Sequence, residues 1–155
     1  AADKEKFYSS YLFAAVHVLS SIPGQQTIVD LAASLGLPVS KISEVVDFLI
    51  NLGVIKETNG KLSPGQQHIH LGSNSKEIFK HHLNWRLKAL EQLNEEPERD
   101  LHYSVVFSLS ENDVKRIKEM LLSSLNDISK VIYDSKDETA YVYCFDFFEL
   151  GQKSK

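Results

Sequence analysis

The chain has 155 residues, of which 43% are hydrophobic and 25% are charged, a composition that excludes collagen-like, rod-like and disordered proteins. Its 17 lysines and arginines against 21 aspartates and glutamates give a net charge of −4, which excludes a uniformly basic nucleic-acid coat. One cysteine excludes a disulfide scaffold, and no apolar run approaches the roughly 18 residues of a membrane span. We therefore expect a cytoplasmic protein without a membrane segment. Because it opens on Ala1 rather than on methionine, we expect a fragment of a longer chain.

Residues 4–21 carry apolar side chains at spacings of three and four on two stripes, which predicts one helix buried on most of its sides. The Pro23-Gly24 pair is expected to end this helix. Thr27 followed by Asp30 resembles a capping box, in which a side chain accepts a hydrogen bond from the helix start. A second, short helix is therefore expected to begin there and to end at Gly36 in a left-handed conformation.

A third helix is expected over residues 38–53, because proline fits the first turn of a helix and glycine often follows its end. The apolar period then changes. Residues 54–57 predict a short strand, and Asn59-Gly60 is the strongest two-residue signal for a hairpin turn. Residues 61–63 predict the return strand, which residues 66–71 are expected to extend.

Three helices followed by a hairpin is the element order of a winged helix-turn-helix domain, which we expect over residues 1–72. Residues 31–55 closely resemble bacterial winged-helix regulators in their Leu-Ala start, Leu-Gly turn, spaced serines and final glycine. In that pattern the small Ala32 lets two helices cross closely, Gly36 supplies the turn, and Gly53 ends the recognition helix and begins the wing.

A recognition helix contacts the DNA major groove with the exposed residues near its N-terminus, and a wing contacts the minor groove or backbone. On this basis the expected DNA-binding residues are Ser40, Lys41, Ser43, Lys56 and Lys61. Glu44 and Asp47 lie among them, and carboxylates that face phosphate weaken binding. The sequence therefore leaves two interpretations open, a winged helix that contacts DNA and one that contacts proteins.

Counted by segment, the charge does not single out a nucleic-acid face. Residues 1–72 hold five cations and six anions, a net charge of −1. Residues 73–93 sum to +2, residues 94–100 to −3 and residues 101–155 to −2, and none of these values is typical of a nucleic-acid-binding surface.

The second half of the chain predicts a different kind of unit. Residues 73–93 predict a connecting helix, and the acidic residues 94–100 predict a linker. Alternating apolar and polar residues predict strands over 101–109 and 140–150, joined by a long helix that Ser110 caps. A strand–helix–strand crossover makes the two strands parallel, and two strands alone are marginal. The hairpin, another chain or an absent domain is therefore needed to complete the sheet.

The predicted fold class is thus α+β: a winged helix-turn-helix, a connecting helix and a β-α-β unit. The β-α-β unit, residues 101–150, is followed by a tail over residues 151–155 and is expected to mediate dimerisation or ligand sensing. Its second strand carries Val142 and Phe148 on the face opposite its tyrosines, and a second apolar face favours a homodimer interface or a second layer. A ligand held between the aromatic strands and the long helix is a third, weaker hypothesis.

The sequence predicts neither a metal site nor a catalytic site. His68 and His70 share one face of a predicted strand, and His81 and His82 follow in the connecting helix, but no cysteine or aspartate accompanies them as a further ligand. No nucleophile–base spacing, phosphate-binding loop or dinucleotide-binding motif is present. We therefore expect no enzymatic activity, no cofactor and no metal.

Nearly all of residues 4–150 resembles a bacterial family of unknown function, whose members look like winged-helix proteins with a strand–helix–strand C-terminal region. The matching segments are residues 7–19, 35–37, 52–55, 59–61, 98–100, 108–110 and 142–150. The resemblance implies a transcription regulator, since members are regarded as such, and an upstream Cro-like helix-turn-helix domain as a partner. One departure is Phe148-Glu149-Leu150, where the family tends to have proline at the middle position.

The leading hypothesis is the regulatory portion of a cytoplasmic bacterial transcription regulator that acts as a homodimer and whose winged helix contacts DNA. The alternative is a protein-interaction or dimerisation module of a regulator whose DNA reader is the upstream domain. An acidic exposed side of the third helix favours this alternative.

Overall fold

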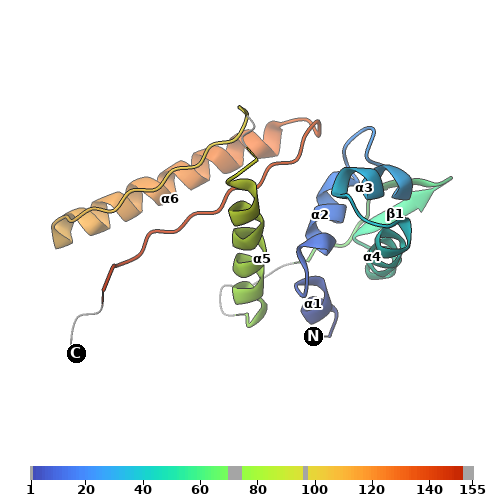
Figure 1. The fold of residues 1–155 in the computed structure, drawn as a ribbon, viewed down its shortest axis with the longest axis horizontal. Helices are drawn as coiled ribbons and strands as arrows, with labels where there is room; N and C mark the ends of the chain where they lie inside the picture. Colours follow the sequence, from blue (N-terminus) through green and yellow to red (C-terminus); the bar gives the residue numbers. More distant parts are fainter. Residues whose placement is uncertain (1, 70–74, 96–97, 152–155) are drawn as a thin grey trace. The chain divides into compact units, whose positions relative to one another are not determined.

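The computed structural model describes residues 2–69, 75–95 and 98–151. Within these residues the secondary structure is six helices and one two-stranded antiparallel sheet, so the fold is mixed α and β, as predicted. The chain divides into two compact units (Figure 1). The first comprises residues 1–92 and 137–144, and the second comprises residues 93–136 and 145–155.

The first unit begins with two helices where the sequence predicted one. Helix α1 spans Ala2–Phe7 and helix α2 spans Tyr11–Leu19. The Ser10 hydroxyl caps α2 by accepting a hydrogen bond from the backbone N–H of Leu12 at 3.2 Å, while the Ser9 hydroxyl donates to the carbonyl of Lys6 at 2.6 Å. These serine side chains offer the backbone partners that a continuous helix does not, so the single-helix prediction over residues 4–21 was wrong.

Helix α3 spans Ile28–Leu35 and is bounded as predicted. The Thr27 hydroxyl accepts a hydrogen bond from the backbone N–H of Asp30 at 3.1 Å, which is one half of a capping box. Gly36 follows the helix in the left-handed region with φ 65°, a conformation that glycine adopts without steric cost.

Helix α4 spans Val39–Leu52, and its N-cap is Pro38. Gly53 ends it in the left-handed region, with φ 78°. The chain then forms strand β1, Ile55–Thr58, and strand β2, Lys61–Pro64, which pair antiparallel with Ile55 opposite Pro64 and Thr58 opposite Lys61. Residues 66–69 are not a strand, so the predicted extension of the hairpin is absent there, and residues 70–71 lie outside the described residues.

One hydrophobic core joins these helices to the hairpin. Helix α4 supplies its centre, because α2, α3 and β1 all pack against it. The buried residues of this core are Phe7, Tyr8, Leu12, Phe13, Val16, Leu31, Ala32, Ile42, Val45, Val46, Leu49, Val54, Ile55 and Leu62. The core therefore fixes the positions of α4 and the hairpin relative to each other.

Helix α5, Glu77–Gln92, packs on the start of the chain through its polar and aromatic side. The Asn84 side-chain amide donates to the backbone carbonyl of Tyr8 at 3.0 Å. The Trp85 ring lies edge-on to Tyr11 at 6.2 Å, and the Lys88 ammonium lies 4.3 Å from the centre of the same tyrosine ring. The start of the chain therefore contacts α5 as well as the helices of its own core.

The second unit holds helix α6, Glu111–Asp134. The Ser110 hydroxyl caps it, as predicted, by accepting from the backbone N–H of Asp113 at 3.2 Å. The predicted apolar stripe is half-buried at its first four members, which are Val114, Ile117, Leu121 and Leu125. Across the described parts of the chain, no helix has the length and apolar character needed to cross a membrane.

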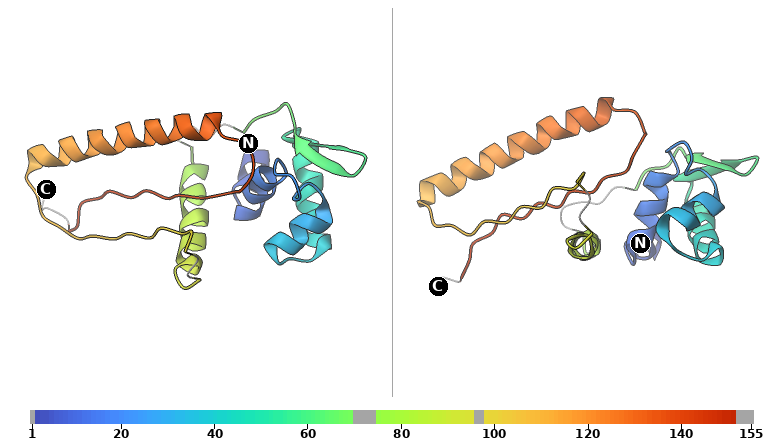
Figure 2. Two further views of the ribbon diagram at one scale, coloured as in Figure 1. Left: turned by 90° about the horizontal axis from the view of Figure 1, so that it is seen from above. Right: turned by 45° about the horizontal axis from the view of Figure 1, so that its top comes forward.

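The predicted strands over residues 101–109 and 140–150 are not formed, which corrects the β-α-β part of the predicted fold. Figure 2 draws residues 101–109 as an extended trace, and neither segment is paired as a strand. The physical reason is that two strands on their own are marginally stable in water, and no further strand among the described residues joins these segments. Both segments are drawn as extended traces, as the sequence indicated.

Candidate functional site

Helix α4 presents one exposed face to solvent opposite its core face. Ser40 and Lys41 lie on this face, together with Glu44 and Asp47 one and two turns further on. Ser43, which the sequence placed in the same set, is half-buried. The helix core face explains this arrangement, since Ile42, Val45, Val46 and Leu49 are all buried. The structure therefore brings Ser40 and Lys41 together and turns Ser43 partly inward.

The only predicted DNA-binding cation on α4 has an acidic neighbour. The Lys41 ammonium lies 3.8 Å from a Glu44 carboxylate oxygen, one turn along the helix. Both side chains are more than half exposed, so the ion pair itself contributes little to stability. Its consequence is electrostatic, because the positive charge of Lys41 is partly compensated at the surface of the helix.

The hairpin places its two lysines on one face. Its two turn residues, Asn59 and Gly60, have φ 52° and 80°, the pair of positive φ values that a type I′ turn requires. Lys56 pairs opposite Ser63, and Lys61 pairs opposite Thr58. Directly opposite residues of an antiparallel pair share a face, and so do alternate residues along one strand. Both lysines therefore lie on the face opposite the buried face.

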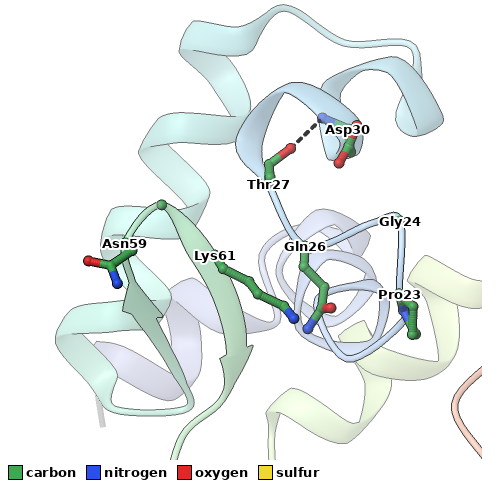
Figure 3. Close-up of a pocket in the computed structure, with 8 residues that line it drawn as sticks. Pro23, Gly24, Gln26, Thr27, Asp30, Asn59 and Lys61 are labelled. Atoms are coloured by element: carbon green, nitrogen blue, oxygen red, sulfur yellow. Dashed lines mark hydrogen bonds between the residues drawn. The ribbon is translucent and has the colours of Figure 1, made fainter.

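A hollow of about 370 Å³ lies beside the turn, between the hairpin and the start of α3 (Figure 3). In Figure 3, Lys61 extends from β2 toward Gln26, which lies in the loop before α3. Asp30 supplies the acidic side chain of the lining. The full lining is Pro23, Gly24, Gln26, Thr27, Asp30, Asn59, Gly60 and Lys61.

Gln26 ties the hairpin to the loop that precedes α3. Its backbone carbonyl accepts from the N–H of Leu62 at 2.7 Å, and its side-chain amide donates to the carbonyl of Leu62 at 2.9 Å. These two bonds hold β2 next to the helix unit, so they fix the backbone position of the neighbouring Lys61. Gln26 was not predicted as a site residue, because only the three-dimensional pairing with Leu62 reveals its role.

Two histidines of the first unit, His17 and His81, have pKa values below the ordinary value. Burial lowers the pKa of His17 below its ordinary value, and the charge of nearby His68 lowers it further. Burial, followed by the charges of His82 and Arg86, lowers the pKa of His81. Within the described residues no group of three histidine, cysteine or carboxylate side chains is arranged to hold a metal, and His70 lies outside those residues.

We expect the free energy of unfolding to decrease as the pH falls below about 6.5, the ordinary pKa of histidine. The folded state holds His17 neutral, whereas the unfolded state takes up a proton near its ordinary pKa, so acid favours unfolding. Urea unfolding at pH 7.5 and pH 5.5, followed by the fluorescence of Trp85, measures this difference. His17→Gln should reduce it, whereas His102→Gln in the other unit should leave it unchanged. If both variants reduced the difference in unfolding free energy between the two pH values equally, the pH dependence could not be assigned to His17.

Comparison with family models identifies a family. A family model described as a domain of unknown function matches residues 1–150, which is almost the whole chain. No curated protein matches the chain. No solved structure matches it either.

Proposed function

The chain belongs to the family of the domain of unknown function DUF4423, and from this premise we propose that it is the regulatory portion of a cytoplasmic bacterial transcription regulator. In this proposal residues 2–69 form a winged helix-turn-helix, with α3 and α4 as its two helices and the hairpin as its wing. Exposed residues of α4 enter the major groove, and the hairpin lysines contact the backbone or minor groove. Residues 101–150 pair two copies of the chain.

The observation that carries the proposal is the connection from α3 to the hairpin. Gly36 and Gly53 both adopt left-handed conformations, so α3 turns sharply into α4 and α4 turns sharply into β1. A short turn between two crossing helices is the geometry with which a helix-turn-helix motif presents its second helix. The core fixes α4 against the hairpin, so both elements can contact one DNA duplex.

The lysines of the hairpin support the proposal that the hairpin faces DNA together with α4. Lys56 and Lys61 share the outer face of the hairpin, and the two hydrogen bonds of Gln26 to Leu62 hold that face in place. A lysine at this position neutralises a phosphate without ordering a flexible loop, since β2 is already anchored. Phosphate contacts of this kind position a protein on DNA and do not read its sequence.

Lys61→Ala is expected to weaken binding to mixed-sequence DNA a few-fold and to reduce the salt dependence of the affinity by about 0.9 in log–log slope, the effect of one lost phosphate contact. Fluorescence anisotropy with a labelled duplex, between roughly 50 and 200 mM salt, measures both quantities. Lys130→Ala, an exposed lysine of α6, is the matched control and should change neither. No wild-type binding at low salt, or an unchanged slope in Lys61→Ala, would overturn the direct-contact proposal.

The second candidate function is a protein-interaction module, in which an upstream domain reads the DNA. The acidic face of α4 favours it, because Glu44 and Asp47 are exposed and Glu44 compensates Lys41. A surface of mixed charge suits a protein partner better than a phosphate backbone. The two functions therefore differ in how the affinity for DNA responds when those carboxylates are neutralised.

A further inference from the structure

The second unit leaves its apolar residues uncovered. Not one residue of the 24-residue helix α6 is buried, although its apolar stripe is regular. Residues 101–109 are exposed throughout. Six apolar side chains of this unit are at least 78% exposed, namely Leu101, Tyr103, Val106, Tyr133, Phe148 and Leu150. Exposed apolar surface on this scale indicates that another surface covers it.

The two extended segments of this unit lie close to each other without forming strands. The rings of Phe107 and Phe147 stack at 6.4 Å between centroids, with 18° between their planes. Residues 101–109 nevertheless have no strand partner among the described residues. Two strands without further support are marginally stable in water, and this unit offers two segments. Two copies of the unit offer four segments and two helices.

Residues 101–109 have the properties of an open strand edge. The segment contains no lysine, arginine, aspartate, glutamate or proline, the residues that natural proteins use to block pairing at an edge. Its alternate residues form one apolar face, and His102, Ser104, Val106 and Ser108 lie on the other. Residues 145–150 differ, because they include Asp146 and Glu149 and would bring like charges together if paired with themselves.

The apolar face of residues 101–109 is also symmetric about its centre. Reversing the segment about Val105 places Leu101 opposite Leu109 and Tyr103 opposite Phe107. Val105 then lies opposite its own copy. Aliphatic and aromatic pairs of this kind are the favourable cross-strand pairs of antiparallel sheets. A twofold axis generates this pairing, since the same patch of both copies then meets itself.

We propose that two copies of this chain form a twofold dimer in which residues 101–109 pair antiparallel with themselves, centred on Val105. The inference rests on the proposed pairing role of residues 101–150 and names the segment and register that perform it. The aromatic side chains among the six exposed residues bury roughly 150–250 Å² each when covered. With Leu101 and Leu150 they supply about the 800 Å² per partner that a standard interface contains, and Val106 is left out of this area because it lies on the other face of the segment.

The test uses the whole chain and reads its mass in solution. Wild-type protein should sediment as a dimer, with twice the 17.5 kDa mass of one chain. Val105→Glu should raise the dimer dissociation constant about a hundredfold, because two buried valines are lost and two like charges face each other across the axis. Val105→Lys should do the same. The neighbouring Val106→Glu, on the other face of the segment, should change the dissociation constant by less than about fivefold.

Mixing the Val105→Glu and Val105→Lys variants provides the decisive result. Only if position 105 faces its own copy do the introduced carboxylate and ammonium form an opposite-charge pair, so the mixture should regain dimers that neither variant forms alone. This recovery also shows that both variants are folded. A monomeric wild-type protein, or a mixture that stays monomeric, would overturn the inference. The measurement involves no DNA, so the dimer can be confirmed even where the proposed DNA contact fails.

Discussion

Gly65→Ala is expected to destabilise the unit formed by the helices and the hairpin by about 3 kcal/mol, the upper part of the range for an added methyl group without space. A Cβ atom at residue 65 would collide with the carbonyl oxygen of Gly53 and lie 2.9 Å from its carbonyl carbon and 3.0 Å from that of Val54. These are backbone atoms, so no side-chain rotation relieves the contact. The close approach follows from the hydrogen bond that Gly65 donates to the carbonyl of Val54 at 2.9 Å.

Gly36→Ala is the matched control, because it adds the same methyl group where no atom lies within 4 Å. Its cost is the left-handed backbone alone, about 1–2 kcal/mol for a residue with a Cβ atom. Urea unfolding of both variants, followed by the fluorescence of Trp85, measures the difference. Equal losses of unfolding free energy in the two variants would show that the segment around residue 65 moves away from Gly53. That result would contradict the close backbone contact.

The parts of the fold that the sequence predicted correctly depend on local chemistry. Thr27 and Ser110 cap helices because their hydroxyls reach a backbone N–H three residues ahead. Gly36 and Gly53 end helices because glycine adopts the left-handed conformation cheaply. Ser10 also caps a helix, through the N–H two residues ahead, and this cap was missed because the apolar stripes continue on both sides of Ser10.

The parts that failed depend on contacts between distant residues. Alternation predicted strands over residues 101–109 and 140–150, but alternation describes a segment that suits a sheet and does not supply its neighbours. For the candidate site, the hairpin turn and the strand period were enough to predict Lys56 and Lys61 on the hairpin. The half-burial of Ser43 depends on tertiary packing, and the anchoring of Leu62 by Gln26 joins residues 36 positions apart.

The acidic face of α4 distinguishes the two candidate functions. Glu44→Gln combined with Asp47→Asn is expected to raise the affinity for mixed-sequence DNA about fivefold if α4 faces the duplex. Two unit charges near 4 Å interact by about 1 kcal/mol in water, so removing two carboxylates that face phosphate recovers about that much in total after salt screening. The substitution also removes the acidic partner that lies 3.8 Å from Lys41. Anisotropy titrations at about 100 mM salt measure the gain.

Glu119→Gln combined with Asp127→Asn is the matched control, since it removes the same two charges from exposed residues of α6. A gain confined to the α4 variant means that its acidic face lies against phosphate, as the DNA-contact proposal requires. Equal gains in both variants reflect net charge alone and contradict a specific role for α4. If neither variant changes the affinity for DNA, α4 lies away from the duplex. Its carboxylates can then contact a protein, and the exposed face of α4 fits the protein-interaction module.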